Sequence, residues 1–360
     1  MRSIRDIKLF ENIPILVRTA MNVPIKNGNV TSEYRLRRAL PTIRFLSERG
    51  AKVILIGHIG EKGTETLAPV AEKLGELISG VSFSPEIIGE NARAAIRGLA
   101  PGGILVLENL RRNAGEKTND KSFARELAAL GDIFVQDCFD TCHRAHASIV
   151  GIPELLPSYA GFLLEDEVME LSRALTPKRP SLAVIGGIKF STKEAVLTRL
   201  LTIYDNIFIG GALANSFLKA SGKNVGKSIS SNTDEQTIKK ILDNPKIILP
   251  IDFVIKNEMI LDHGTGTEAL LAGLVQKAKT ILWNGPLGNY ENGFTCATDA
   301  FAHTVAESDA YSVIGGGDTV AAVEGLGLLP HFSFVSTGGG AMLDFLATGT
   351  LPGIEALNNH

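Results

Sequence analysis

The sequence predicts an α/β fold of two domains, each a three-layer α/β/α unit with a mainly parallel, Rossmann-like sheet. Short β-rich apolar runs alternate with amphipathic segments of helical length, which is typical of parallel sheets covered on both faces. The strand-like runs fall into two groups, and 360 residues are enough for two domains.

The expected elements follow this alternation. Strands in the first half are expected near Ile15–Thr19, Lys52–Gly57, Gly103–Leu107 and Asp132–Gln136. Strands in the second half are expected near Ser181–Ile185, Asn206–Gly210, Lys246–Leu249, Thr280–Asn284, Tyr311–Ile314 and Ser333–Ser336. The clearest helical patterns are Glu33–Glu48, Leu67–Leu77, Ser122–Leu130, Lys193–Leu201 and Gly266–Lys277.

The boundary between the two groups is a charged helical pattern, Glu165–Arg173, followed by a segment with two prolines, Thr176–Pro180. A charged helix that ends at prolines fits a connector between domains. We therefore expect domains at 1–164 and 181–340, a connector at 165–180 and a C-terminal tail at 341–360.

Composition narrows the function classes. The chain has 44% apolar and 21% charged residues and a formal net charge of −3, so it gives no reason to expect nucleic-acid or membrane binding. It has no apolar run of the roughly 18 to 20 residues that span a bilayer and no signal-peptide core, which predicts a cytoplasmic protein. Cys138, Cys142, His143 and His146 are poorly spaced for structural zinc, so we interpret the cysteines as free thiols.

The stretch Val313–Ala322 is the strongest local signal. Three glycines, Gly315, Gly316 and Gly317, follow an apolar strand and precede a helical pattern from Thr319 onward, which predicts a phosphate-binding turn. A carboxylate at Asp318 would repel phosphate unless Mg²⁺ lay between them. The alternative is an ordinary strand-to-helix turn in which Asp318 caps the helix.

Further glycine turns follow other strands of the second half, at 186–187, 210–211, 284–286 and 337–340. Lys189 and Lys193 come after the first of them and would share one helix face if the helix starts early, as counter-charges for polyphosphate or as exposed caps. Glycine turns at several strand ends of one sheet indicate a nucleotide. The motifs of P-loop and dinucleotide-binding proteins are absent from the sequence.

In the first half of the chain, the residues that follow the strands are cationic. Arg35 opens a helix, His58 and Arg111 follow strands, and His143-Arg144-Ala145-His146 follows the fourth strand. Carboxyl ends of strands are where open α/β sheets hold ligands, so these groups predict a small anionic substrate bearing phosphate or carboxylate.

Several long phrases together resemble the phosphoglycerate kinase family, nearly end to end. The phrases are Asn22–Pro24, Arg37–Ile43, Leu107–Arg111, His143–Ser148, Trp283–Gly288, Gly315–Thr319 and Ser336–Ala341. The resemblance implies two lobes that face each other across a cleft and close by hinge bending. It also implies a glycolytic phosphotransferase with a carboxyl group as acceptor, which interconverts 1,3-bisphosphoglycerate and MgADP with 3-phosphoglycerate and MgATP. The expected protein is a monomer, and its C-terminal tail returns to the first lobe.

Matching the phrases position by position assigns roles. The implied glycerate-site residues are Asn22, Arg35, His58, Arg111 and Arg144, and the implied catalytic groups are Arg35, Lys189, Gly316 and Gly339. The implied nucleotide contacts are Gly186, Gly187, Lys189, Lys193, Gly210, Gly211, Asn284, Glu291, Gly315, Gly316, Gly317, Asp318 and Thr319, with Asp318 as the Mg²⁺ ligand. The acceptor carboxylate is ionised at pH 7, so no general base is needed.

Three positions depart from the family pattern. Ala20 stands where the family has an aspartate that holds the substrate hydroxyl, and Glu61 stands where it has a substrate-facing arginine. Thr192 replaces an aspartate between the two lysines. Two alternatives therefore stand beside an active phosphoglycerate kinase: a kinase of the same fold with another acidic substrate, and a catalytically impaired nucleotide-binding homologue.

The departures predict the behaviour of a double variant. Ala20→Asp with Glu61→Arg should lower the Michaelis constant for 3-phosphoglycerate, because a lost hydrogen bond to a charged group costs about 1.5 to 3 kcal/mol. Steady-state kinetics with varied 3-phosphoglycerate measure this. An unchanged constant would mean that other residues compensate for both departures.

Overall fold

The computed structural model describes residues 1–230 and 235–358, and its chain divides into two compact units. Unit 1 comprises Met1–Val168 with the segment from Thr350 onward, and unit 2 comprises Met169–Gly349. Residues 359–360 of the expected C-terminal tail lie outside the described residues. No helix among the described residues is long and apolar enough to span a membrane.

Unit 1 is built on a parallel sheet with the strand order β5-β6-β4-β1-β7-β8. The strands are β1 (Pro14–Thr19), β4 (Lys52–Ile56), β5 (Val81–Ser84), β6 (Ile104–Leu107), β7 (Ile133–Asp137) and β8 (Ser158–Ala160). The small hairpin β2 (Ile25–Lys26) and β3 (Asn29–Val30) turns at Asn27-Gly28, where both residues have positive φ, as a tight hairpin turn requires.

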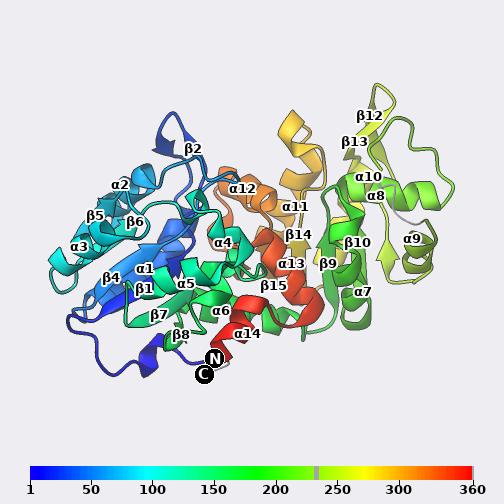
Figure 1. Ribbon diagram of the computed structural model, residues 1–360. Coiled ribbons are helices and arrows are strands. Elements are labelled where there is room, and N and C mark those ends of the chain that lie inside the picture. The colour runs from blue at the N-terminus through cyan, green and yellow to red at the C-terminus, as the bar shows by residue number, and fades with distance from the viewer. Residues whose placement is uncertain (231–234, 359–360) are drawn as a thin grey trace. The chain divides into compact units, whose positions relative to one another are not determined.

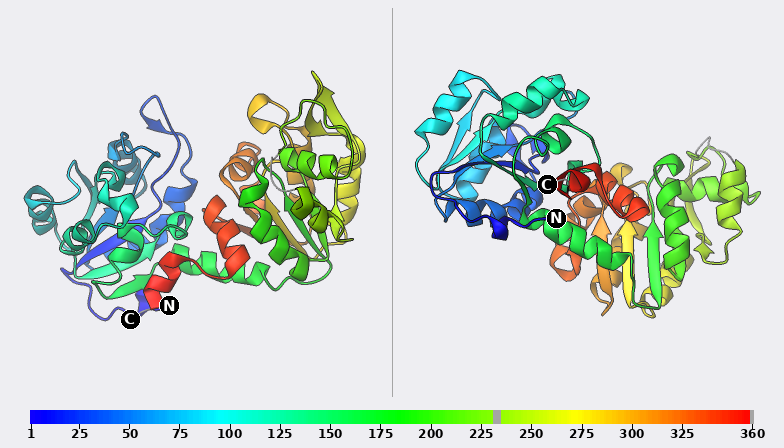
Figure 2. Two further views of the ribbon diagram at one scale, coloured as in Figure 1. Left: turned by 45° about the vertical axis from the view of Figure 1, so that its right-hand side comes forward. Right: turned by 60° about the horizontal axis from the view of Figure 1, so that its bottom comes forward.

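Alternation along the strands of unit 1 builds two apolar layers. Ile15 and Val17 pack with one set of helices and Leu16 with the other, because successive side chains of a strand point to opposite faces. The first layer includes side chains of α1 (Tyr34–Ser47) and α2 (Ala68–Leu77). The second includes side chains of α3 (Glu90–Gly98) and α5 (Lys121–Ala128). Figure 2 shows helices on both sides of the sheet.

The remaining helices of unit 1 are short or lie at its end. They are α4 (Gly115–Thr118) and α14 (Pro352–Asn358), together with the first part of α6 (Phe162–Ala174). The expected connector segment lies largely in α6, and the division between the units falls within this helix, after Val168. Helix α14 packs near β8 and a π-helical turn at Ala147–Gly151 (Figure 1). Gly353 N donates to Cys142 O at 2.9 Å.

Unit 2 contains a second parallel sheet with the order β11-β10-β9-β14-β15-β16. Counted along the chain, this is the 3-2-1-4-5-6 order of the Rossmann fold. The strands are β9 (Ser181–Ile185), β10 (Asn206–Ile209), β11 (Ile247–Ile248), β14 (Thr280–Asn284), β15 (Tyr311–Gly315) and β16 (Phe334–Val335). An antiparallel hairpin, β12 (Phe253–Lys256) and β13 (Met259–His263), is inserted before β14.

The helices of unit 2 alternate with these strands, apart from the hairpin. They are α7 (Glu194–Ile203), α8 (Gly211–Ala220), α9 (Glu235–Leu242), α10 (Thr265–Val275), α11 (Cys296–Ala306), α12 (Gly317–Gly325) and α13 (Gly339–Thr348). Two units with parallel sheets and covering helices confirm the predicted fold class. Every expected strand occurs, with each end within one residue of the prediction, and the expected helices end within two.

Asp137 links the sheet of unit 1 to the start of α6. Its Oδ1 accepts a hydrogen bond from Leu163 N at 2.9 Å, and the side chain is fully buried. Burial raises the pKa of Asp137 to about 8, although hydrogen bonds from Thr42 and from the first amides of α6 oppose the shift.

This raised pKa predicts a pH-dependent stability. The folded pKa lies above the unfolded value of about 3.9, so the contribution of Asp137 is fully present below about pH 4 and is lost as pH rises toward 8. We expect the urea midpoint of the wild type to fall over this range more than that of Asp137→Asn. Equal pH slopes for the two proteins would contradict the prediction.

Candidate functional site

The cationic residues predicted from the sequence gather at one edge of the unit 1 sheet. Asn22 follows β1, His58 follows β4 and Arg111 follows β6, while Arg35 lies in the first turn of α1. Arg144 follows β7, and its charge contributes to lowering the pKa of both His58 and Arg111, which places it in the same group. The structure therefore brings the five predicted acid-binding residues together.

Arg18, which the sequence analysis did not single out, organises this edge. It lies on β1 and is fully buried. Its Nε donates to Ser148 Oγ at 3.0 Å and its Nη1 to Thr19 O at 2.8 Å. Its Nη2 lies 3.0 Å from His58 Nδ1. Because a guanidinium only donates, His58 Nδ1 must accept, and the ring hydrogen must reside on Nε2.

His58 is held neutral by these surroundings. Burial, and then the positive charge of Arg18, lower the pKa of His58 well below its usual range, while Asp140 opposes the shift. The ring therefore offers a hydrogen-bond donor at Nε2 throughout the neutral pH range.

Asp140 is a second residue that the sequence analysis missed. Its carboxylate contacts the cluster: Oδ2 lies 3.7 Å from Arg35 Nη1, and Oδ1 accepts from Cys138 Sγ at 2.8 Å. Burial would raise the pKa of Asp140, but the positive charge of Arg35, the hydrogen bond from Cys138 and the charge of Arg18 lower it to about 2. Arg35 Nη1 also donates to Asn22 O at 2.5 Å, so its head group is fixed.

Glu61, the first departure from the family pattern, contacts this cluster directly. Its Oε2 lies 3.5 Å from Arg111 Nη1, which also donates to Gly60 O at 2.5 Å. Burial lowers the pKa of Arg111 and Glu61 opposes that shift. Ala20, the second departure, is completely buried. The Glu61 carboxylate thus occupies a position next to a cation that was predicted to bind substrate.

In unit 2, the predicted glycine turns pack against one another where the strand order reverses, between β9 and β14. A Cβ at Gly186 would overlap Pro286 O, and one at Gly211 would lie 2.8 Å from Gly187 N. Gly285 has φ of +95° and equally has no room for a side chain. Only glycine permits this approach of three backbone turns. The carboxyl ends of strands at such a reversal are the usual ligand site of this fold.

Two helix starts adjoin the same place. Helix α12 begins at Gly317 after Gly316, which has φ of +105°, and α13 begins at Gly339. A Cβ on Gly339 would lie 3.0 Å from Gly316 Cα, so the two turns touch. The first amides of both helices are unpaired within the helix and favour an anion.

Asp318 and Thr319 have different surroundings. Asp318 is exposed in the first turn of α12, so the alternative in which it caps the helix is wrong, because Gly316 holds the cap position. Thr319 is buried, and its Oγ1 accepts from Gly285 N at 2.8 Å. Asn284 Nδ2 donates to Gly315 O at 2.9 Å. Thr319 and Asn284 therefore tie the β14 turn to the β15 turn.

Lys189 and Lys193 would share one helix face only if the helix started early, and this condition is not met. A short 3₁₀ turn occupies Phe190–Thr192, and α7 starts only at Glu194, so both lysines precede the helix. Lys189 is exposed. Lys193 folds back so that a Cβ on Gly187 would lie 3.4 Å from its Nζ. Burial lowers the pKa of Lys193, and the charge of Asp318 opposes this.

A cavity of about 600 Å³ joins these features. Of the predicted residues, those that line it are Gly187, Lys189, Lys193, Gly211, Asn284, Glu291, Gly316, Gly317, Asp318, Thr319 and Gly339. The other three, Gly186, Gly210 and Gly315, are buried at the strand ends and do not line it. The cavity wall also contains His263 and Asn215, which the sequence analysis missed because neither belongs to a glycine turn.

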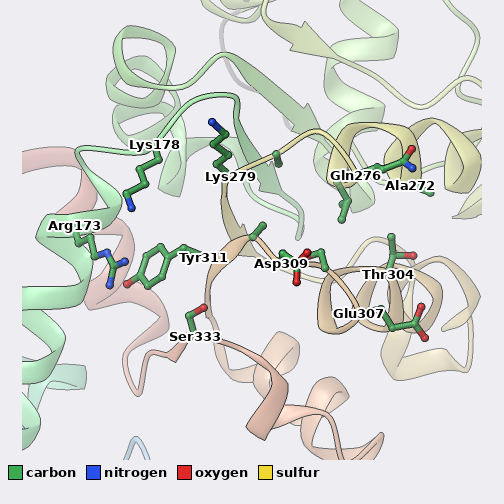
Figure 3. Close-up of a pocket in the computed structure, with 14 residues that line it drawn as sticks. Arg173, Lys178, Ala272, Gln276, Lys279, Thr304, Glu307, Asp309, Tyr311 and Ser333 are labelled. Atoms are coloured by element: carbon green, nitrogen blue, oxygen red, sulfur yellow. The ribbon is translucent and has the colours of Figure 1, made fainter.

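A second hollow of about 740 Å³ in unit 2 lies at the opposite edge of the sheet (Figure 3). It includes Tyr311, the first residue of β15, and Lys279, the residue before β14. Arg173 stacks on the Tyr311 ring with 3.8 Å from its Cζ to the ring centroid. The described residues that line this hollow include no glycine and no helix start, so the smaller cavity is the better ligand site despite its volume.

The fold and these sites define a class of protein: a two-unit α/β protein with a cationic cluster in one unit and, in the other, a nucleotide-sized cavity lined by helix starts. The comparisons with known proteins are specific. The family model for phosphoglycerate kinase matches residues 4–349, and the chain belongs to the phosphoglycerate kinase family. It is therefore an enzyme, a phosphotransferase of glycolysis.

Individual relatives cover nearly the whole chain. The phosphoglycerate kinase of Azorhizobium caulinodans is 44% identical over 378 residues, 95% of this chain and 96% of that protein. The one from Moorella thermoacetica is 41% identical, covering 99% of this chain and 98% of its own. Among solved structures, phosphoglycerate kinase from Pyrococcus horikoshii OT3 superposes with a TM-score of 0.90 at 32% identity, covering 99% of this chain and 98% of its own.

The contact between the two helix starts predicts the effect of one methyl group. Gly339→Ala should separate the α12 and α13 turns by a few tenths of an ångström and weaken ADP binding about tenfold, equivalent to about 1.4 kcal/mol. Calorimetric titration with ADP measures this. Gly325→Ala, at the end of α12 with open space at its Cβ, serves as the control and should bind as the wild type does. An unchanged affinity in Gly339→Ala would contradict the geometry.

Proposed function

We propose that the chain transfers a phosphoryl group between 1,3-bisphosphoglycerate and MgADP, giving 3-phosphoglycerate and MgATP. The observation that carries this proposal is the unit 2 cavity, in which the starts of α8, α12 and α13, two lysines and the exposed carboxylates of Glu291 and Asp318 surround a space of nucleotide size. Family membership supplies the reaction class, and the cationic edge of unit 1 supplies a binding site for the acid.

In this proposal the nucleotide phosphates lie at the starts of α12 and α13. The first amides there are oriented before the ligand arrives, so they need no reorganisation during transfer. The Gly187 and Gly211 turns provide a flat backbone wall for the base, and Glu291, exposed after β14, is placed to contact the ribose. Lys193, partly desolvated, supplies fixed positive charge.

Asp318 fits a Mg²⁺ ligand. It is exposed, lines the cavity and lies in the first turn of α12, where phosphate oxygens would share the ion. Among the described residues no group of three or more histidine, cysteine or acidic side chains could form a protein-only metal cage. Mg²⁺ commonly binds by one or two carboxylates together with substrate phosphates. When bound, the ion neutralises charge on the phosphate oxygens.

The acid is proposed to bind at the unit 1 cluster. Arg111 and Arg144 provide positive charge for the phosphate, and His58 Nε2 provides a neutral donor. Arg35, fixed by Asn22 O and Asp140, provides charge next to the reacting carboxylate. In the direction that consumes MgATP, a carboxylate oxygen of 3-phosphoglycerate bonds to the γ-phosphorus while the bond from that phosphorus to the bridging oxygen breaks and ADP leaves. Positioning and charge are therefore the main requirements. Direct transfer requires the two ligands to meet, and we propose that hinge closure of the units achieves this.

A second candidate is a same-fold kinase for an acid without the 2-hydroxyl group. The contact between Glu61 and Arg111 favours it, because the carboxylate competes with an anionic substrate group, and buried Ala20 cannot accept a hydrogen bond. A coupled assay with 3-phosphoglycerate and MgATP separates the candidates. Turnover supports the first, whereas ADP binding without turnover supports the second or a catalytically impaired protein.

We also propose that the enzyme is a cytoplasmic monomer that uses neither nucleic acid nor membranes. The small net charge of −3 supports the absence of nucleic-acid and membrane binding. Size-exclusion chromatography with light scattering would test the monomer directly.

Lys189 gives the sharpest test of the transfer step. Lys189→Met should lower kcat by roughly two to three orders of magnitude, as removal of a transition-state donor does, while ADP affinity changes little. Lys277→Met, which removes another exposed lysine of unit 2, is the matched control and should keep wild-type kcat. Equal losses of kcat in both variants, or none in Lys189→Met, would argue against the assigned role.

A further inference from the structure

A buried line of polar groups runs through unit 1 from Glu116 to His58. Glu116 is completely buried: its Oε1 accepts from Ser148 Oγ at 2.6 Å and its Oε2 from Ser148 N at 3.1 Å. Ser148 Oγ in turn accepts from Arg18 Nε at 3.0 Å, and Arg18 Nη2 meets His58 Nδ1 at 3.0 Å. Glu116 and Ser148 lie behind the predicted acid site, and the proposed transfer uses neither of them directly.

We propose that Glu116 is a positioning residue that acts through Ser148 and Arg18 to hold His58 as the neutral tautomer with its hydrogen on Nε2. The link to substrate affinity rests on the proposed function, since His58 is assigned to the acid site there. The positioning itself depends only on the contacts within unit 1.

Glu116 determines which group donates and which accepts at each hydrogen bond between it and His58. A serine hydroxyl has one hydrogen, and Glu116 takes it because an ionised carboxylate only accepts. Ser148 Oγ must therefore present a lone pair to Arg18 Nε. With the Nε end anchored and Nη1 donating to Thr19 O and Cys138 Sγ, the remaining nitrogen is aimed at His58.

An amide in place of the Glu116 carboxylate would break this order. A glutamine side chain has only one acceptor oxygen, whereas Ser148 donates to Glu116 from both its N and its Oγ. The amide nitrogen of glutamine would therefore face one of these two donors, and a buried mismatch of this kind is costly. The hydroxyl could then turn toward Arg18, which has no lone pair to receive it. Arg18 would lose its anchor, and His58 Nδ1 would no longer face a fixed donor.

The charged groups around His58 support a change in its tautomer and protonation in such a variant. His58 is faced by Arg18, Asp140, Arg111 and Arg144, and of these Arg18 has the largest electrostatic effect on its pKa. Glu116 itself is faced by His146, whose Nδ1 is 3.7 Å away and whose pKa burial lowers to about 4, so this neighbour stays neutral near pH 7. Displacing Arg18 should leave His58 free to exchange tautomers and to protonate as pH falls.

The first test observes the tautomer and protonation of the His58 ring directly. Nitrogen-15 NMR of the histidine side chains in the full, ligand-free chain reports tautomer and protonation, with His58→Gln used to assign the signal. We expect the wild type to show only the Nε2–H form between about pH 5.5 and 8, where neutral imidazole is the form favoured by burial. Glu116→Gln and Ser148→Ala should each show mixed tautomers and a pH titration of His58. Ser148→Thr, which keeps the hydroxyl, should restore the wild-type pattern.

Kinetics give the second readout. In Glu116→Gln and Ser148→Ala, the KM for 3-phosphoglycerate should rise about tenfold and become pH-dependent, while kcat changes by less than about threefold, since a merely structural loss would not produce this separation. Glu154→Gln, an exposed surface residue of unit 1, removes the same charge without touching the line and should match the wild type.

The outcomes distinguish the positioning proposal from the assignment of His58 to the acid site. If both Glu116→Gln and Ser148→Ala fold and keep a pure Nε2–H ring, the positioning proposal is overturned. If Glu116→Gln does not fold, Ser148→Ala decides alone, because it leaves the carboxylate in place. If the ring changes but KM does not, positioning stands and the assignment of His58 to the acid site fails.

Discussion

Close backbone packing at the ends of β9 and β14 is the constraint on which the unit 2 site depends. Gly186, Gly211 and Gly285 each leave no room for a side chain, so the turns meet backbone to backbone. This packing fixes the positions of Thr319 and Asn284, which connect the β14 turn to the β15 turn. The backbone packing and these two buried side chains together hold the turn from which α12 begins beside the cavity.

Unit 1 depends on a different constraint, because it contains buried cations. An unpaired buried charge is strongly destabilising, so Arg18 requires partners on every side. Ser148, Thr19 O, Cys138 and His58 provide them, and Asp140 and Glu116 supply nearby negative charge. These contacts hold the cationic edge together, and burial with the nearby charge of Arg18 keeps His58 neutral among the arginines.

Much of this architecture could be predicted from the sequence. The long apolar runs of β9 and β14 have only one reasonable interpretation, and glycine clusters mark turns by chemistry that does not depend on the rest of the fold. Strands β5 and β8 were missed because serines interrupt or flank their apolar residues, so neither has a continuous apolar run. The start of α7 was predicted to within one residue, but the 3₁₀ turn before it was not expected, because spacing alone cannot separate such a turn from the first turn of an α-helix.

The functional groups that the sequence could not reveal are those defined by tertiary contact. Arg18 lies inside an ordinary apolar strand, and nothing local distinguishes it from a surface arginine until Ser148 and His58, about 130 and 40 residues away in the sequence, are brought to it. Asp140 is identified as a counter-ion only by its distance from Arg35.

The position of α14 has a consequence for how the protein is made. Its Gly353 packs against Ile149 and Cys142 of unit 1, although about 180 residues of unit 2 intervene in the chain. A ribosome releases the N-terminal residues long before it has synthesised this helix, so unit 1 must wait in an incomplete form while unit 2 emerges. The surface that α14 covers, which includes the thiol of Cys142, therefore stays uncovered until the last helix of the chain has been made.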